Sequence, residues 1–222
     1  MPYAMTHLII ADSLSKALTK HISNLPQFYL GNIAPDAVHS RVNYISDYKK
    51  DSHLCPSDEK WGMISNTDEW ITNVIRFLDS HISSVNHDFA IGYCCHILAD
   101  IYQYIALWLP FNEKYADVID NGIIVNQMLK ETNMIDIELA LTYEKRDIFW
   151  SYIQQSVGVD LPGIICAADV EKQKDSILSL WYIDKERQDL ASNEIVTVES
   201  IMSFIKNAVD SITLYLQEHL DM

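Results

Sequence analysis

The sequence is poor in basic residues, glycine and proline, and it lacks a long uninterrupted apolar run. Sixteen Lys and Arg stand against thirty-one Asp and Glu, which gives a formal net charge of −15. This charge argues against duplex nucleic acid or an anionic membrane as a tightly held partner. The most apolar segment is interrupted by His96, Asp100 and Gln103, so it falls short of the ~18 apolar residues of a membrane span. We therefore expect neither a stable nucleic-acid complex nor a transmembrane segment.

The few cysteines form no recognisable framework. Cys55, Cys94, Cys95 and Cys166 show neither a CxxC pair nor the spacing of a disulfide scaffold. We interpret them as reduced, buried, small hydrophobic residues, which fits a reducing compartment. The opening stretch MPYAMTHLIIADSLSK also lacks the basic region and small-residue cleavage site of a signal peptide. These features predict a cytoplasmic protein.

No repeat, low-complexity tract or linker divides the 222 residues, a length that suits one domain with a full core. We therefore expect a single domain over residues 1–222. Apolar residues recur with helical spacing, and β-like runs are too few to make a sheet. Helices are predicted near residues 6–20, 65–83, 88–109, 113–132, 144–157, 168–186 and 197–220. This pattern indicates an all-α fold with a long irregular loop region at residues 25–66, between the first helices.

The segment GYCCHILADI, residues 92–101, places His96 and Asp100 in otherwise apolar surroundings. A helix that is apolar nearly all round is buried in a bundle, and residues four apart share one of its faces. Burying an ionised carboxylate is costly unless the group is paired or bound to a metal. Either the two side chains satisfy each other through a hydrogen bond, which is common, or they form part of a metal site.

Polar residues also gather in the irregular region, in YLGNIAPDAVHS and KKDSHLCPSDEKWG. Pro35 restricts the backbone directly before Asp36, which follows an apolar run. A structured loop that presents acids and histidines beside a buried helix is typical of a functional site, the alternative being a solvated surface loop. His39, three residues after Asp36, is an extra ligand, a substrate contact or a surface residue.

Four segments in order carry a family resemblance: THLIIADSL with His7, YLGNIAPDA with Asp36, SHL with His53, and GYCCHILADI with His96 and Asp100. Together they resemble the zinc-dependent phospholipase C family, whose superfamily includes the S1/P1-type nucleases. The resemblance extends to about residue 108. It implies a single all-α domain of the phospholipase C/P1 nuclease type, with zinc ions held between helices and loops.

The resemblance also implies roles for these residues. Asp36, His53, His96 and Asp100 match the ligands of one zinc, and His7 matches a ligand of a second zinc that shares Asp100. Asp36 matches a carboxylate that touches both the metal and the attacking water, so it is the candidate general base. The implied activity is hydrolysis of a small phosphodiester or phospholipid-like substrate by metal-activated water.

The chain departs from the family pattern after this point. The family's third zinc uses a His shortly beyond the HxxxD motif and then a HxxxE pair, whereas the only histidine after His96 here is His219. In secreted members the mature N-terminal residue is also a ligand, at a larger spacing from the His that His7 matches. We therefore expect one zinc ion or two, or another divalent metal in their place.

Two other functions remain as alternatives. An HD-type metal phosphohydrolase would use His53, the adjacent pair His87 and Asp88, and Asp169, but such a pair is frequent by chance and Asp is favoured at a helix start. The second alternative is a metal-binding helical module without catalysis, which the incomplete zinc cluster favours. The sequence thus favours a zinc-dependent phosphoric ester hydrolase over both.

Overall fold

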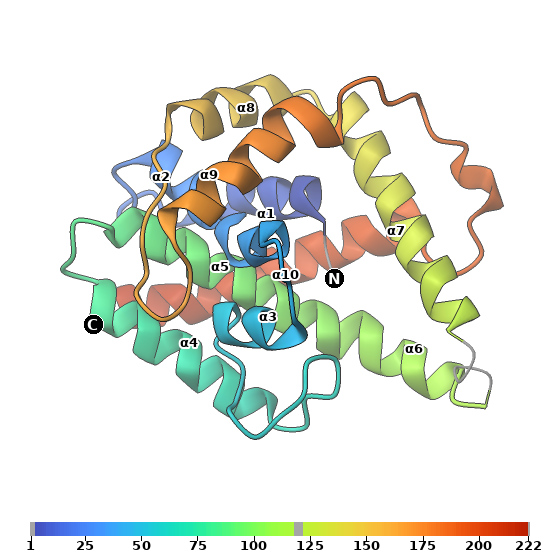
Figure 1. Cartoon of the computed structure of the whole chain (residues 1–222), viewed down its shortest axis with the longest axis horizontal. Coiled ribbons are helices and arrows are strands. Elements are labelled where there is room, and N and C mark those ends of the chain that lie inside the picture. Colours follow the sequence, from blue (N-terminus) through green and yellow to red (C-terminus); the bar gives the residue numbers. More distant parts are fainter. Residues whose placement is uncertain (1–2, 118–121, 222) are drawn as a thin grey trace.

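The computed structural model describes residues 3–117 and 122–221, and it shows a bundle of helices (Figure 1). These residues contain no strand and only two isolated β-bridges, so the predicted all-α class is confirmed. The α-helices are α1 (Ala4–Ala17), α2 (Leu25–Gly31), α3 (Ser46–Ser52), α4 (Thr67–His81), α5 (His87–Gln103), α6 (Leu109–Lys114), α7 (Ile123–Thr142), α8 (Arg146–Gln155), α9 (Ala167–Ser176) and α10 (Val198–Leu220). Short 3-10 turns are η1 (Ala34–Ser40) and η5 (Leu190–Ser192), and π turns are η2 (Tyr104–Trp108) and η4 (Ile177–Trp181).

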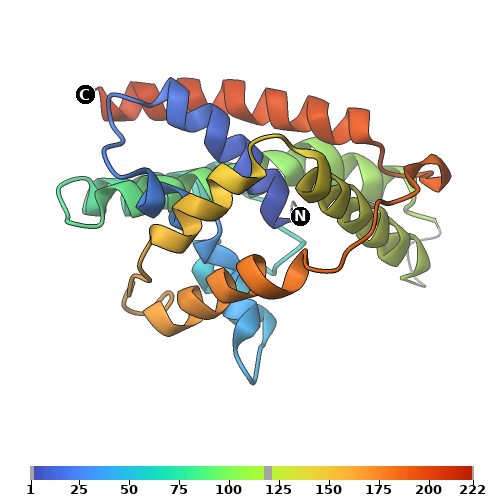
Figure 2. The same ribbon diagram turned by 90° about the horizontal axis from the view of Figure 1, so that it is seen from above.

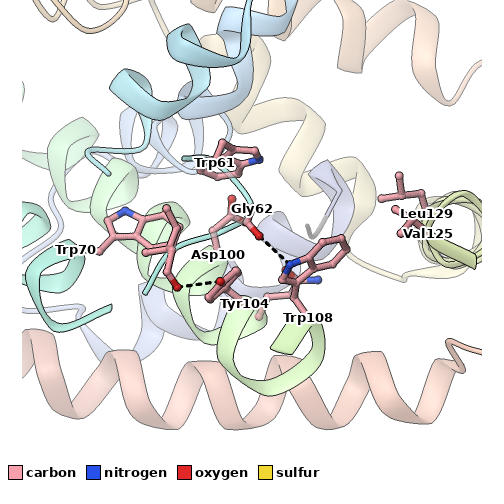
Figure 3. Close-up of a pocket in the computed structure, with 10 residues that line it drawn as sticks. Trp61, Gly62, Trp70, Asp100, Tyr104, Trp108, Val125 and Leu129 are labelled. Atoms are coloured by element: carbon pink, nitrogen blue, oxygen red, sulfur yellow. Dashed lines mark hydrogen bonds between the residues drawn. The ribbon is translucent and has the colours of Figure 1, made fainter. Parts of the chain in front are cut away.

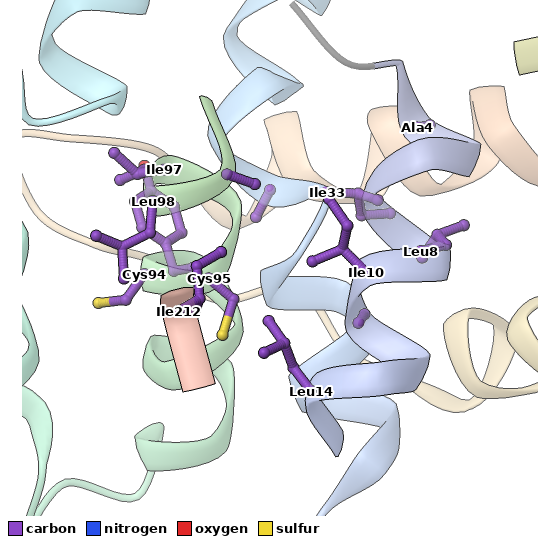
Figure 4. Packing of buried hydrophobic residues seen from close by; sticks show 14 of the residues in the cluster. Ala4, Leu8, Ile10, Leu14, Ile33, Cys94, Cys95, Ile97, Leu98 and Ile212 are labelled. Atoms are coloured by element: carbon purple, nitrogen blue, oxygen red, sulfur yellow. The ribbon is translucent and has the colours of Figure 1, made fainter. Parts of the chain in front are cut away.

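Helix α5 forms the centre of the core. It contacts α1, α2, α4 and α10, and nearly all of its residues are buried. Figure 2 shows α10 running along one side of the molecule, next to α1. Figure 4 shows how side chains of α5 and α10 approach those of α1, with Cys94, Cys95, Ile97, Leu98, Ile212, Leu8, Ile10 and Leu14 in the same apolar cluster. Polar side chains on α5 are therefore surrounded by protein, as the sequence predicted.

Two glycines bring the backbones of α2 and α5 into direct contact. A Cβ atom on Gly92 would lie 2.1 Å from the carbonyl oxygen of Phe28, and one on Gly31 would lie 2.2 Å from that of Phe89. Any larger residue would force the two helices apart. This close approach places Asn32, the residue after α2, against α5, and η1 continues from there.

The first turn of α1 is held by a buried carboxylate from α7. Asp136 accepts hydrogen bonds from the backbone N–H groups of Met5 (3.3 Å) and Thr6 (2.9 Å), and from the Thr6 hydroxyl (3.1 Å). The Tyr182 hydroxyl donates a further bond to it at 2.6 Å. Because the first N–H groups of a helix have no partner within it, this carboxylate both satisfies them and fixes where α1 begins.

The predicted irregular region at residues 25–66 is wrong in part, since it contains α2, η1 and α3. Asn24 caps α2 by accepting a bond from the Gln27 N–H, and prolines lie in the first turns of both α2 and η1. Proline at the start of a helix fits because its missing N–H would have no partner there. These short helices depend on packing against α5 more than on a periodic pattern.

The helix predicted at residues 113–132 is also misplaced. Helix α6 ends at Lys114, and α7 begins at Ile123 after Gly122, whose φ of 66° is left-handed. Residues 118–121 of the predicted segment lie outside the described residues. The last helix was placed well: Thr197 caps α10 and exchanges side-chain to backbone bonds with Ser200.

All four cysteines are free thiols, as predicted. Cys94 and Cys95 are buried and Cys55 is half-buried, but Cys166 is exposed, so the prediction of four buried thiols is wrong at that residue. None of the helices in the described ranges combines the length and hydrophobicity needed to cross a bilayer.

Candidate metal centre

The five residues that the sequence singled out lie together in the interior, although they span ninety-four positions of the chain. His7 comes from α1, Asp36 from η1, His53 from the end of α3, and His96 and Asp100 from α5. The side chains of four of these residues are almost fully buried: His7, His53, His96 and Asp100. The Asp36 side chain is 19% exposed. Asp36 therefore forms the side of the cluster that solvent reaches.

Asp36, His53 and His96 bring their donor atoms close together, and Asp100 adjoins them beside His53. The His53 Nε2 lies 3.3 Å from the His96 Nε2, 3.3 Å from the Asp100 Oδ2 and 3.5 Å from the Asp36 Oδ1. The His96 Nε2 lies 3.9 Å from the Asp36 Oδ2. A tetrahedral zinc with bonds of about 2.0–2.1 Å separates its ligand atoms by about 3.3–3.4 Å. The spacing of these donor atoms is close to that of a zinc ligand set.

The hydrogen bonds of the two imidazoles leave both Nε2 atoms free to bind a metal. The Nδ1 of His96 lies 2.7 Å from the Asn32 carbonyl oxygen, and the Nδ1 of His53 lies 3.0 Å from that of Lys49. Because a carbonyl oxygen can only accept, each Nδ1 carries the proton and donates it. Both Nε2 atoms then point lone pairs toward each other across 3.3 Å, an arrangement that a cation between them would stabilise.

The unpaired polar atoms of Asp100 and His7 are the strongest indication that a metal ion binds between these side chains. Neither carboxylate oxygen of Asp100 and neither ring nitrogen of His7 has a hydrogen-bond partner. The His7 Nε2 lies 3.5 Å from the Asp100 Oδ1, and the His7 ring stacks on His96 with centroids 3.7 Å apart. An unsatisfied buried carboxylate is costly, so His96 and Asp100 do not satisfy each other as the simpler interpretation supposed. Imidazole nitrogens with carboxylate oxygens suit zinc.

Burial and neighbouring charges keep these groups in the protonation states that metal ligands require. Burial, aided by His7, lowers the pKa of His96 to about 3, and burial together with Lys49 lowers the pKa of His53. Burial alone would raise the pKa of Asp100, but His53 and His7 hold that pKa well below its usual value. The imidazoles of His53 and His96 are thus neutral and the Asp100 carboxylate is ionised at neutral pH.

Lys49 is a member of the cluster that the sequence interpretation missed. Its side chain is 1% exposed, and its ammonium lies 2.6 Å from the Asp36 Oδ1, 3.3 Å from the His39 Nε2 and 4.9 Å from the centre of the Trp61 ring. Burial would raise the pKa of Asp36, yet the ammonium and nearby imidazoles hold that pKa well below its usual value. Lys49 precedes His53 by four residues, so their shared helical face could have revealed it.

Two cavities border the cluster, one at Asp100 and the other at Asp36. The first, of about 350 Å³, has Asp100 in its wall among aromatic and apolar residues. Figure 3 shows Trp61, Trp70, Tyr104 and Trp108 around it, with Tyr104 bonded to the Ile64 carbonyl and Trp108 to that of Gly62. Tyr104 and Trp108 lie on the π turn η2, a distortion often found at functional sites.

The second cavity, of about 220 Å³, is lined by Asp36, His39 and Lys49 together with Tyr3, Ala4, Leu129 and Trp181. Leu129 also borders the first cavity. His39, left open between ligand, substrate contact and surface residue, lies at this cavity with its Nε2 3.6 Å from the Asp36 Oδ1. The polar cluster therefore has space on its Asp100 side and on its Asp36 side.

The residues of the HD-type alternative do not assemble. The His87 Nε2 donates to the carbonyl oxygen of His21, Asp88 accepts from Ser23, and Asp169 pairs with Arg41 at 2.7 Å. Within the described ranges, the groups of three residues able to hold a metal ion are His7, His96 and Asp100, and Asp36, His53 and His96. The geometry thus favours the HxxxD motif over the adjacent His–Asp pair.

Comparison with known proteins agrees with this geometry. Residues 6–103 match the family model of zinc-dependent phospholipase C, which confirms the resemblance seen in the sequence. The matched range contains all five clustered residues. No curated protein and no solved structure matches the chain.

Proposed function

We propose that this chain, whose residues 6–103 match the family model of zinc-dependent phospholipase C, hydrolyses a phosphodiester or phospholipid-like substrate at the centre described above. The observation that carries the proposal is the buried, unsatisfied Asp100 carboxylate, which faces imidazole nitrogens spaced as zinc ligands. A metal-dependent hydrolase family is supported by the family match, and the substrate and residue roles are our inference.

In this proposal Asp36, His53, His96 and Asp100 hold the zinc, and His7 adds a donor at the other oxygen of Asp100. When bound, zinc lowers the pKa of a water molecule and polarises the phosphoryl oxygen of the substrate. The carbonyl oxygens of Asn32 and Lys49 hold the two imidazoles in the orientation that aims each Nε2 inward.

Asp36 is the proposed catalytic residue. It is the most exposed of the five, and it lines the cavity on the Lys49 side, where a water molecule can reach it. Because its pKa lies well below the usual value, it accepts a hydrogen bond from the attacking water and orients it, rather than storing the proton. His39, half-exposed beside it, is within reach to exchange that proton with solvent.

A phosphodiester fits the space better than a small monoester. A diester carries a substituent on each side of phosphorus, and the polar cluster has a cavity on each of two sides. The larger cavity, with its tryptophans and tyrosine, suits an apolar or aromatic substituent. The smaller one, beside Asp36 and His39, suits a polar leaving group.

The test is hydrolysis of chromogenic substrates by zinc-loaded protein, with bis(p-nitrophenyl) phosphate and p-nitrophenyl phosphocholine as diesters and p-nitrophenyl phosphate as monoester. We expect diester hydrolysis that chelator and Asp36→Asn abolish. His96→Ala, which removes a ligand, should lose zinc and activity, and His87→Ala, at the start of the same helix, is its matched control.

Each alternative has its own signature in this experiment. Loss of metal in His87→Ala with retention in His96→Ala would establish the HD-type assignment. One equivalent of tightly bound zinc with no hydrolysis of any ester would show a metal-binding module without catalysis.

A further inference from the structure

Lys49 places its ammonium group against a carboxylate that would otherwise be open to a metal ion. Its ammonium is buried and lies against the Asp36 Oδ1 at 2.6 Å and the His39 Nε2 at 3.3 Å. The two partner atoms are themselves 3.6 Å apart, a spacing at which both could contact one small cation. The ammonium therefore occupies a position that a carboxylate oxygen and an imidazole nitrogen would offer to an ion.

The remaining donors provide one complete ligand set. Both groups of three residues that could hold a metal ion include His96. Its Nδ1 donates to Asn32, so the Nε2 is its single free lone pair and can bind one ion only. An ion that uses His96 with His53 and Asp36 leaves His7 and one oxygen of Asp100 for any other.

The charges of the cluster point the same way. Asp36 and Asp100 carry two negative charges, and Lys49 neutralises one of them at contact distance. A single divalent ion with neutral imidazoles then brings the cluster to +1, whereas two ions would bring it to +3. A net charge of +3 is costly in a site shielded from water. A net charge of +1 matches the single negative charge of a phosphodiester.

We propose that the Lys49 ammonium takes the place of a second metal ion, so that the centre binds one divalent cation and carries its other positive charge on a side chain. The inference rests on the proposed metal-dependent function. It predicts that removing the ammonium opens a second metal position between Asp36 and His39.

The experiment counts bound zinc by equilibrium dialysis of the full chain at micromolar free zinc. We expect one equivalent in the wild type and two in Lys49→Met, and a rise in melting temperature with zinc that is larger in the variant. Lys50→Met is the matched control, because the neighbouring Lys50 ammonium bonds the Ser57 carbonyl rather than Asp36. It should keep one equivalent. The double variant Lys49→Met/His39→Ala should return to one, since it lacks the second ligand of the new position.

Lys49→Gln repeats the test with a residue that can still donate to Asp36, in case the methionine variant does not fold. Two tightly bound equivalents in the wild type, or one in both Lys49 variants, would overturn the inference while leaving the proposed function intact. No bound zinc in the wild type would instead remove the proposed function.

Discussion

Two buried aspartates approach the first turns of α1, and they are treated in opposite ways. Asp136, on α7, accepts hydrogen bonds from Met5, Thr6 and Tyr182, with distances between 2.6 and 3.3 Å. Asp100, on α5, faces His7, the residue of α1 that follows Thr6. Neither carboxylate oxygen of Asp100 has a hydrogen-bond partner. The residue type and the depth of burial are the same, so the difference lies in what surrounds each carboxylate.

The comparison separates a structural carboxylate from a candidate metal ligand. Burial raises the pKa of Asp136 even though Met5, Thr6 and Tyr182 donate hydrogen bonds to it, because burial is the larger effect there. The pKa of Asp100 is held well below its usual value against the effect of burial, because His53 and His7 surround it. Asp136 completes the helix that carries His7, while Asp100 leaves its lone pairs open to a ligand.

The substitution Asp100→Asn should have the largest effect on function. It keeps the shape but removes a charged ligand, so zinc affinity should fall by at least about 100-fold and diester hydrolysis by about 1,000-fold. In chelator, however, the variant should be at least as stable as the wild type, because an unsatisfied buried charge has gone. Zinc titration, hydrolysis rates and urea unfolding in chelator measure the three quantities. A variant that keeps wild-type zinc affinity would show that Asp100 is not a ligand.

Two of the candidate ligands could be paired in the sequence because their spacing is local. His96 and Asp100 share a helical face by virtue of a four-residue separation, and Pro35 marks the turn that presents Asp36. Their convergence followed from the order of the motifs, and the contact between Gly31 and Gly92 supplies the physical reason. That contact joins two glycines that are 61 positions apart in the chain, and no local pattern predicts which glycines will meet.

Lys49 and the bounds of α7 could not be read in the same way. Lys49 and Lys50 look alike in the sequence, but one ammonium is buried against Asp36 and the other bonds a surface carbonyl. Only the tertiary position of α3 distinguishes them. The helix predicted at residues 113–132 starts too early because this segment carries enough apolar residues for a helix. The left-handed backbone at Gly122 places the start of α7 at Ile123 instead.

The substitution Asp136→Asn tests the other side of the comparison. It replaces an acceptor of four hydrogen bonds by an amide with one acceptor oxygen, so donors at the start of α1 lose their partner. We expect a loss of about 2 kcal/mol in the free energy of unfolding. Zinc affinity should change less than about threefold, because His7 and Asp100 keep their positions in the folded state. Urea unfolding in chelator and zinc titration check both values.

Thr6→Val removes only one of the four hydrogen bonds to Asp136, the one from the Thr6 hydroxyl. It should lower the free energy of unfolding by about 1 kcal/mol. If Asp136→Asn instead lost zinc as severely as Asp100→Asn, the division between a structural and a binding carboxylate would be wrong.

The last test is the pH dependence of stability without zinc. The pKa of His96 is about 3 in the folded protein, against about 6.5 for an unperturbed histidine. Between these values the unfolded chain binds the proton and the folded one does not, so stability falls as pH falls. The slope is about 1.4 kcal/mol per pH unit for each such histidine, and His53 adds to it because its pKa is also lowered.

Asp136 acts in the opposite direction near pH 4, because its raised pKa lets the folded state take up the proton first. The imidazoles should therefore dominate between pH 6.5 and about pH 4. Below that, Asp36 and Asp100, whose pKa values are lowered, add to the loss of stability, and Asp136 offsets part of it. Urea unfolding in chelator at half-unit pH steps measures the slope, and His96→Gln should reduce it by the share of one histidine. A stability that stays constant from pH 7 to pH 5 would mean that these imidazoles are not held neutral in the folded protein, and the case for two free Nε2 donors would fail with it.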